Sequence, residues 1–299
     1  MNIVTLTLNP CIDRTLWVEE HGEKPYSVDL ETGGKGINVA RVLGRLGVSA
    51  VAVCPVGGET GAQFLALAES EGITVAPVEA AAPVRVIDTW VRRRDFDQRV
   101  DYAKGGTLTE EELDALESTL FAQLENAEVL AICGSASCEA AARRVPGLIR
   151  RAQKMGVRVL LDSNGPALTL GAAACPDLIK PNEDELHALT GIKDDPSAAA
   201  QKLLEAGVGG VIASLGRAGC MWAGPGFEEY CPSPRVETVN AVGSGDSFVA
   251  GFLFASFKGY APQTALMIAC AAGAANAAMF PAAQIGREDV EALLGWKLS

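Results

Sequence analysis

The chain has 299 residues, of which 48% are hydrophobic and 21% charged, and its formal net charge is −12. This composition suits a globular protein, and the negative charge argues against general binding to nucleic acid or anionic membranes. The eight cysteines form no CxxC pair, and the N-terminus has no signal-peptide pattern, so we expect free thiols and a cytoplasmic location. With only two histidines, a His-based zinc site or a Ser-His-Asp triad is disfavoured.

The first part of the chain alternates between strand and helix patterns. Residues 3–8 have the residue types of a buried strand, and a helical apolar face follows over 37–46. A second buried strand is expected at 51–53, and a glycine-rich turn then opens a helix that ends near 72. This order predicts a parallel sheet. No GxGxxG motif follows the first strand, which disfavours a dinucleotide-binding site.

Residues 84–104 break this alternation. A strand pattern over 84–91 is followed by Arg92-Arg93-Arg94. We expect a β lid outside the main sheet, with strands from about 12–30 and 84–104, which covers a ligand or contacts a partner. A solvated edge that prevents aggregation explains the arginine run equally well.

The α/β pattern resumes after residue 108, where Thr109 is the expected cap of a helix. No linker or repeat is visible, so we expect a single domain over 1–299. The further strands are expected at 129–133, 157–161, 177–179 and 211–213, and the further helices at 145–155, 183–190, 246–258 and 262–279.

Polar residues follow several of the predicted strands. In open α/β sheets, ligands bind at the carboxyl ends of the strands, so these side chains are expected at one edge. They are Asn9, Asp13, Ser135, Asp162, Lys180, Asn182, Ser214 and Gly216.

The stretch Gly243-Ser244-Gly245-Asp246 precedes an apolar helical run. Glycines let backbone N–H groups face an anion, and a helix N-terminus adds positive potential. An anion site with a carboxylate beside it suits phosphoryl transfer, with Asp246 as base. A helix cap after a glycine turn is an equal alternative.

Two other stretches have the residue types of a phosphate site. Lys35 lies in a glycine-rich turn before a helix, although the Ser or Thr of a Walker A loop is missing. Asn182 and Glu185 are three residues apart on one helix face and could steer hydrated magnesium; stabilisation of the helix dipole is the alternative. Lys180 could reach a nucleotide phosphate or extend along the surface.

Four motifs occur in order along nearly the whole chain: TLNPCID at 7–13, GGKGINVA at 33–40, KPNE at 180–183 and VGSGDS at 242–247. Together they resemble the ribokinase-like (pfkB-type) carbohydrate kinase family. The first two are similar to its hexose-phosphate branch, which comprises 1-phosphofructokinase and tagatose-6-phosphate kinase. The resemblance implies an α/β fold with a mainly parallel central sheet, helices on both faces and a small β lid.

The resemblance also implies transfer of the ATP γ-phosphoryl group to a sugar phosphate, with Asp246 as catalytic base. The N–H groups from Val242 to Gly245, including those of Gly243 and Ser244, match the family's anion hole. The lid often makes a homodimer contact in relatives. The expected sugar-side positions are Asp13, Gly34, Lys35, Asn38, Arg85 and Ser135; the expected ATP positions are Lys180, Ser214, Gly216, Gly219, Gly243, Gly245 and Asn276; the expected magnesium-linked pair is Asn182 and Glu185.

Three departures from the family pattern lie on the sugar side, at 98–102, 134–138 and 162–165. Kinase chemistry is therefore expected more firmly than any one substrate. The arginines of the lid favour a phosphorylated sugar, first fructose 1-phosphate and then tagatose 6-phosphate. A kinase for an unphosphorylated sugar or nucleoside remains open, as does a sugar-phosphate sensor without catalytic activity.

Overall fold

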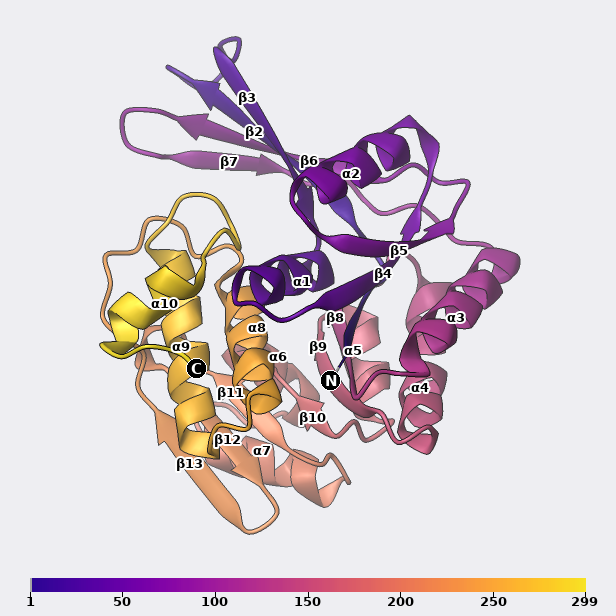
Figure 1. Ribbon diagram of the computed structural model, residues 1–299, viewed down its shortest axis with the longest axis vertical. Coiled ribbons are helices and arrows are strands. Elements are labelled where there is room, and N and C mark those ends of the chain that lie inside the picture. The colour runs from indigo at the N-terminus through magenta and orange to yellow at the C-terminus, as the bar shows by residue number, and fades with distance from the viewer. Residues whose placement is uncertain (1) are drawn as a thin grey trace.

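The computed structural model describes residues 2–299, which form a large mixed sheet, its covering helices and a separate small sheet (Figure 1). The parallel strands of the large sheet are, in order across it, β5, β4, β1, β8, β9, β10 and β11. Strands β12 and β13 extend it as an antiparallel hairpin. Their order is β13-β12-β11-β10-β9-β8-β1-β4-β5. Their bounds are β1 Ile3–Thr7, β4 Ala50–Val56, β5 Thr74–Glu79, β8 Val129–Gly134, β9 Arg158–Ser163, β10 Leu178–Ile179, β11 Val211–Ser214, β12 Cys220–Gly224 and β13 Phe227–Cys231.

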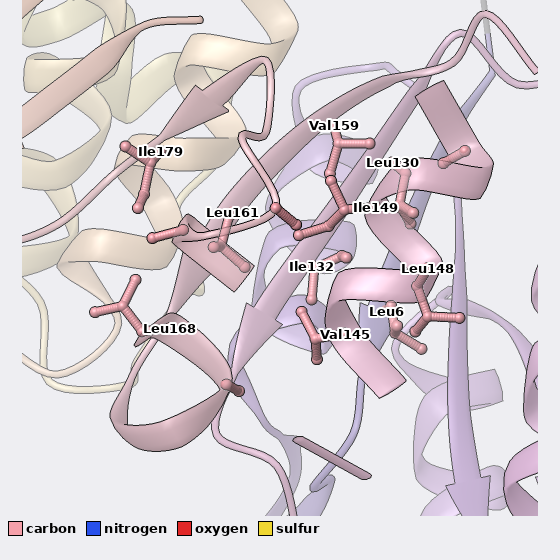
Figure 2. Packing of buried hydrophobic residues seen from close by; sticks show 14 of the residues in the cluster. Leu6, Leu130, Ile132, Val145, Leu148, Ile149, Val159, Leu161, Leu168 and Ile179 are labelled. Atoms are coloured by element: carbon pink, nitrogen blue, oxygen red, sulfur yellow. The ribbon is translucent and has the colours of Figure 1, made fainter. Parts of the chain in front are cut away.

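Helices cover both faces of this sheet because successive strand residues point to opposite sides. In β8, Leu130 and Ile132 pack with α3 to α7, as Figure 2 shows in part, whereas Val129 and Ala131 pack with α1, α8, α9 and α10. The helix bounds are α1 Lys35–Arg45, α2 Gly58–Ser70, α3 Glu110–Leu124, α4 Glu139–Lys154, α5 Gly165–Ala172, α6 Glu183–Thr190, α7 Pro196–Glu205, α8 Ser244–Phe257, α9 Pro262–Ala277 and α10 Arg287–Leu294.

The small sheet projects from the body of the protein beside α2 and forms the lid (Figure 1). Its strand order is β3-β2-β6-β7, and β2 pairs in parallel with β6. The bounds are β2 Cys11–Val18, β3 Ser27–Gly33, β6 Arg85–Arg92 and β7 Gln98–Asp101. These strands overlap the two segments expected for the lid.

The parallel α/β architecture predicted from the alternating pattern is confirmed. Thr109 caps α3 as expected, in a capping box with Glu112. Helix α4 starts at Glu139, earlier than predicted, and runs through Pro146. Proline is common in the first turn of a helix, so Pro146 favours a start near residue 145 instead of the observed start at Glu139. All eight cysteines are free, and six are buried.

Candidate active site

Two cavities of about 1040 and 820 Å³ lie at the carboxyl ends of the parallel strands. The larger one opens between the lid and the sheet, and the smaller one lies against α8 and α9. Both are lined by Asn182, Ser214 and Gly245, so they meet at the start of α8. A reactant in one cavity can therefore face a reactant in the other across this helix N-terminus.

The N-terminus of α8 is built as an anion site. Gly243 is its N-cap with φ of 80°, in the left-handed region that favours glycine. The N–H groups of Ser244 and Ser247 bond to carbonyl oxygens of this turn. Within residues 2–299, those of Gly243, Gly245 and Asp246 have no backbone or side-chain partner. Three donors and the helix dipole thus remain for an anion.

Asp246 lies in the first turn of α8, is 5% exposed and lines the larger cavity. Its Oδ2 accepts a hydrogen bond of 2.8 Å from Nδ2 of Asn38 on α1. Burial raises the pKa of Asp246 to about 6, and the positive charge of Lys35 opposes this rise. The carboxylate is therefore largely ionised at neutral pH but more basic than an exposed aspartate.

Two lysines flank this carboxylate and share a third acidic residue. Nζ of Lys35 and Nζ of Lys180 each lie 3.3 Å from Oδ1 of the fully buried Asp162. Asp162 raises the pKa of Lys35, which keeps the ammonium group charged. Lys180 is 4% exposed, so it is no surface lysine, and it lines the larger cavity rather than the smaller one. The sequence placed Asp162 at this edge without giving it a role.

The lid side of the larger cavity contains Asp13 and Arg85. Burial raises the pKa of Asp13, and its Oδ1 lies 3.4 Å from the thiol sulfur of Cys11. The guanidinium of Arg85 donates to the carbonyl oxygens of Ala103 at 3.1 Å and Asn9 at 3.2 Å. Its Nε is buried and has no partner within residues 2–299. Arg85 therefore brings a cationic guanidinium to the lid wall of this cavity.

Gly34, Lys35, Asn38 and Ser135 line the same cavity, as expected. Asn9, expected at this edge because it follows the first strand, also lines the cavity. Its Nδ2 donates to Oγ of Ser135 at 3.1 Å in the cavity wall.

The other lid arginines do not line this cavity, which corrects their expected contribution to substrate binding. Arg92 and Arg94 pair with Glu20 and Asp95 at the exposed tip of the lid, and Arg99 pairs with Asp101. Their charge is taken up by Asp95 and Asp101, which are close in the sequence, and by Glu20, which is distant. Arg85 is thus the lid arginine that faces the larger cavity.

Asn182 and Glu185 serve a structural purpose and also face the larger cavity. The Asn182 side chain accepts from the Glu185 N–H at 2.8 Å, and Glu185 Oε2 accepts from the Asn182 N–H at 2.9 Å. This capping box fixes both side chains at the start of α6. Within residues 2–299, Glu185 Oε1 accepts no hydrogen bond and is available to a water around a cation. No cluster of three or more His, Cys, Asp or Glu residues within 2–299 could hold a metal directly.

The smaller cavity is lined by Ser214, Gly216 and Gly219, three of the expected ATP positions. They form the turn between β11 and β12, where Gly219 approaches the backbone after β13 too closely for a side chain. Ser244 and Gly245 line the end of this cavity next to Asp246.

Asn276 differs from its expected role at an ATP-binding position. It is fully buried and lines neither cavity. Its Nδ2 donates to the carbonyl oxygen of Val242 at 2.7 Å and to Oγ of Ser244 at 3.1 Å, and its Oδ1 accepts from the Ala283 N–H at 2.6 Å. Asn276 therefore holds the anion-site loop in place instead of contacting a ligand. The resemblance gave the position of Asn276 but not the direction of its side chain.

No helix within residues 2–299 is long and apolar enough to cross a membrane.

The chain is similar to known proteins along most of its length. The model of the pfkB family carbohydrate kinases matches residues 3–280. The chain is 30% identical over 281 residues to a 1-phosphofructokinase of Vibrio cholerae, covering 91% of this chain and 88% of the relative. It is 32% identical over 292 residues to the ATP-dependent 6-phosphofructokinase isozyme 2 of Escherichia coli, covering 92% of each.

The crystal structure of Escherichia coli phosphofructokinase-2 with potassium superimposes with a TM-score of 0.92 at 29% identity, covering 98% of each chain. Ribokinase of Thermotoga maritima shares the fold, with a TM-score of 0.78 at 23% identity, covering 98% of this chain and 99% of ribokinase. The chain therefore belongs to the pfkB family of carbohydrate kinases, has the ribokinase-like fold and is an ATP-dependent sugar-phosphate kinase.

Proposed function

We propose that the protein phosphorylates fructose 1-phosphate with ATP to form fructose 1,6-bisphosphate, and that Asp246 is the general base. The observation that carries this proposal is the buried Asp246 carboxylate beside the unpartnered N–H groups at the start of α8, where the two cavities meet. Relatives of Vibrio cholerae and Bacillus subtilis named 1-phosphofructokinase support the choice of substrate.

In the proposed reaction, Asp246 accepts the proton of the sugar hydroxyl. The oxygen of that hydroxyl bonds to the γ-phosphorus of ATP. The bond from that phosphorus to the bridging oxygen breaks, and ADP leaves. The N–H groups of Gly245 and Asp246 donate to the negative charge of the transferring group. A base with a pKa of about 6 is deprotonated at neutral pH and still basic enough to assist.

The other expected residues divide by cavity. In the larger cavity, the guanidinium of Arg85 would pair with the substrate phosphate, and Asp13 and Ser135 would bind sugar hydroxyls. In the smaller cavity, the Ser214 to Gly219 turn would hold the nucleotide. Lys180 and Lys35 line the larger cavity with Asp246 and would neutralise phosphate charge.

The α6 N-terminus fits a magnesium ion held through water. Carboxylate and amide oxygens are ligands that Mg²⁺ and its water shell prefer, and the capping box has fixed Asn182 and Glu185 at the cavity. Magnesium bound with ATP would neutralise charge on the phosphates.

A second candidate substrate is fructose 6-phosphate. It is favoured by the relative of Escherichia coli named ATP-dependent 6-phosphofructokinase isozyme 2. A solved structure of phosphofructokinase-2 from that organism, described as a complex with fructose-6-phosphate, superimposes with a TM-score of 0.88. Both substrates present a phosphate at one end and a primary hydroxyl at the other. Tagatose 6-phosphate remains a further alternative.

The lid is also the proposed homodimer contact. Large apolar side chains are exposed on its strands and loops, namely Tyr26, Val28, Phe96 and Tyr102. Such a group is typical of an interaction surface. A tetrameric inhibited form is described for phosphofructokinase-2 of Escherichia coli.

The substrate is tested by coupled ADP release with fructose 1-phosphate, fructose 6-phosphate, tagatose 6-phosphate, free hexoses and nucleosides. We expect the highest kcat/KM with fructose 1-phosphate. A higher value with fructose 6-phosphate would select the second candidate, and no turnover with any of them would favour a sensor.

A further inference from the structure

Arg41 is a buried cation on α1 that lines neither cavity. It is 2% exposed, and its guanidinium is held on two sides. On one side, Nε and Nη2 donate to Oε2 of Glu71 at 3.0 and 2.8 Å. On the other side, Nη1 donates to Oδ1 of Asn38 at 2.8 Å. The Asn38 amide therefore links Arg41 to Asp246, because it bonds to both side chains.

This arrangement decides which end of the Asn38 amide faces Asp246. A guanidinium has only donors, so the amide oxygen must face Arg41. The amide nitrogen then points the other way and donates to Oδ2 of Asp246 at 2.8 Å. With the amide reversed, its oxygen would oppose an ionised carboxylate, and its N–H groups would oppose the guanidinium. Both contacts would be repulsive.

We infer that Arg41 is a positioning residue for phosphoryl transfer: it fixes the Asn38 amide so that an N–H group, and not a carbonyl oxygen, faces the general base. This inference rests on the proposed role of Asp246 as that base. The bond from Asn38 engages Oδ2, which leaves Oδ1 of Asp246 for the proton of the sugar hydroxyl.

Arg41 is itself oriented by the root of the lid. Glu71, which follows α2, accepts from the N–H group of Thr32 at 2.8 Å and from its hydroxyl at 2.6 Å. Arg41 Nη2 donates to the Thr32 hydroxyl at 2.8 Å and also to the Thr32 carbonyl oxygen. Thr32 belongs to lid strand β3. The planar guanidinium of Arg41 engages Glu71, Thr32 and Asn38 together through separate nitrogen atoms. The single ammonium nitrogen of a lysine cannot reproduce this geometry.

Other charges act on the base independently of this network. Lys35 from α1, Asp162 at the end of β9 and Lys180 after β10 influence Asp246 directly. Asp13 and Glu31 of the lid feel the charge of Arg41. A lysine at position 41 keeps the positive charge opposite Glu71, so the charge balance stays in place. It loses the bond from Nη1 to Asn38, so the orientation of the Asn38 amide is no longer fixed.

The test is R41K in steady-state ADP-release assays over a range of pH. We expect kcat to fall about tenfold, as is typical when a residue that orients a functional group is lost. The acid limb of the pH profile should move upward, because Asp246 loses a donor that favours its ionised form. The matched control is R45K on the same helix, where Arg45 bonds to Gln284 and should leave both measurements unchanged.

A double variant separates positioning from a purely structural role. In the N38A background, R41K should shift neither kcat nor the acid limb further, because the amide it orients is absent. The inference is overturned if R41K lowers the melting temperature but leaves kcat and the acid limb as in the unmodified protein. It is also overturned if the effect of R41K persists in the N38A background.

D246N distinguishes this failure from failure of the proposed base. If D246N is inactive and R41K behaves like the unmodified protein, only the role of Arg41 is refuted. If D246N retains turnover, the proposed base is refuted and the inference falls with it.

Discussion

Gly243 gives the sharpest test of the anion site at α8. Its φ of 80° costs an alanine roughly 1–2 kcal/mol in backbone strain. A Cβ there would also lie 3.0 Å from Cβ of Ala282 and 3.0 Å from the Ala283 nitrogen, so the loop must shift by a few tenths of an ångström. This shift moves the N–H groups of Gly245 and Asp246 away from the transferring charge. Small displacements of catalytic groups can cost on the order of 100-fold in rate.

We therefore expect G243A to lower kcat by about 10- to 100-fold while the protein remains folded. The matched control is G259A just beyond the other end of α8, where φ is 73° and a Cβ would meet no atom within 4 Å. G259A bears a similar backbone cost without touching the site. ADP release and thermal unfolding measure both effects. Equal kcat values for G243A and G259A would refute the reasoning.

Three further predictions concern the site. First, kcat/KM should fall as pH drops below about 6, because a buried base with its pKa raised to about 6 must be deprotonated to act; a flat profile between pH 5 and 7 would contradict this, with the fold checked by circular dichroism. Second, R85A should raise KM for the sugar phosphate at least about tenfold with little change for ATP; R99A at the exposed lid edge is the control, and equal KM changes for both substrates would remove Arg85 from the sugar site. Third, N276A should lower stability by about 1–3 kcal/mol and also lower kcat, with KM for ATP nearly unchanged; a large rise in that KM alone would restore Asn276 as an ATP ligand.

The sequence predicted those parts of the site whose geometry is local. The glycines at 243 and 245 and the aspartate that follows favour a helix N-terminus through local conformation alone. In the structure, this helix starts at Ser244. The parallel sheet followed from alternating apolar runs, because such runs must be buried on both faces. The edge that gathers Asn9, Asp162 and Lys180 followed from the same rule.

The remainder depended on contacts between distant parts of the chain. Arg41 reads as one more polar residue of a helix, and only folding brings Glu71 to it. Asn276 was expected at a position where the family binds ATP, yet packing turned its amide away from both cavities. The arginines near 92–99 suggested an anion site until their carboxylate partners at the lid tip were visible. Partner choice among charges is set by tertiary structure, which periodicity and spacing do not encode.

The most direct test of the account is turnover by D246N with saturating ATP and fructose 1-phosphate. Asparagine keeps the size of the side chain but cannot accept the hydroxyl proton, so we expect kcat to fall on the order of 10²- to 10⁴-fold. Binding of ATP, measured by calorimetry, should remain close to that of the unmodified protein. Turnover by D246N near the unmodified rate would contradict the assignment of Asp246 as general base.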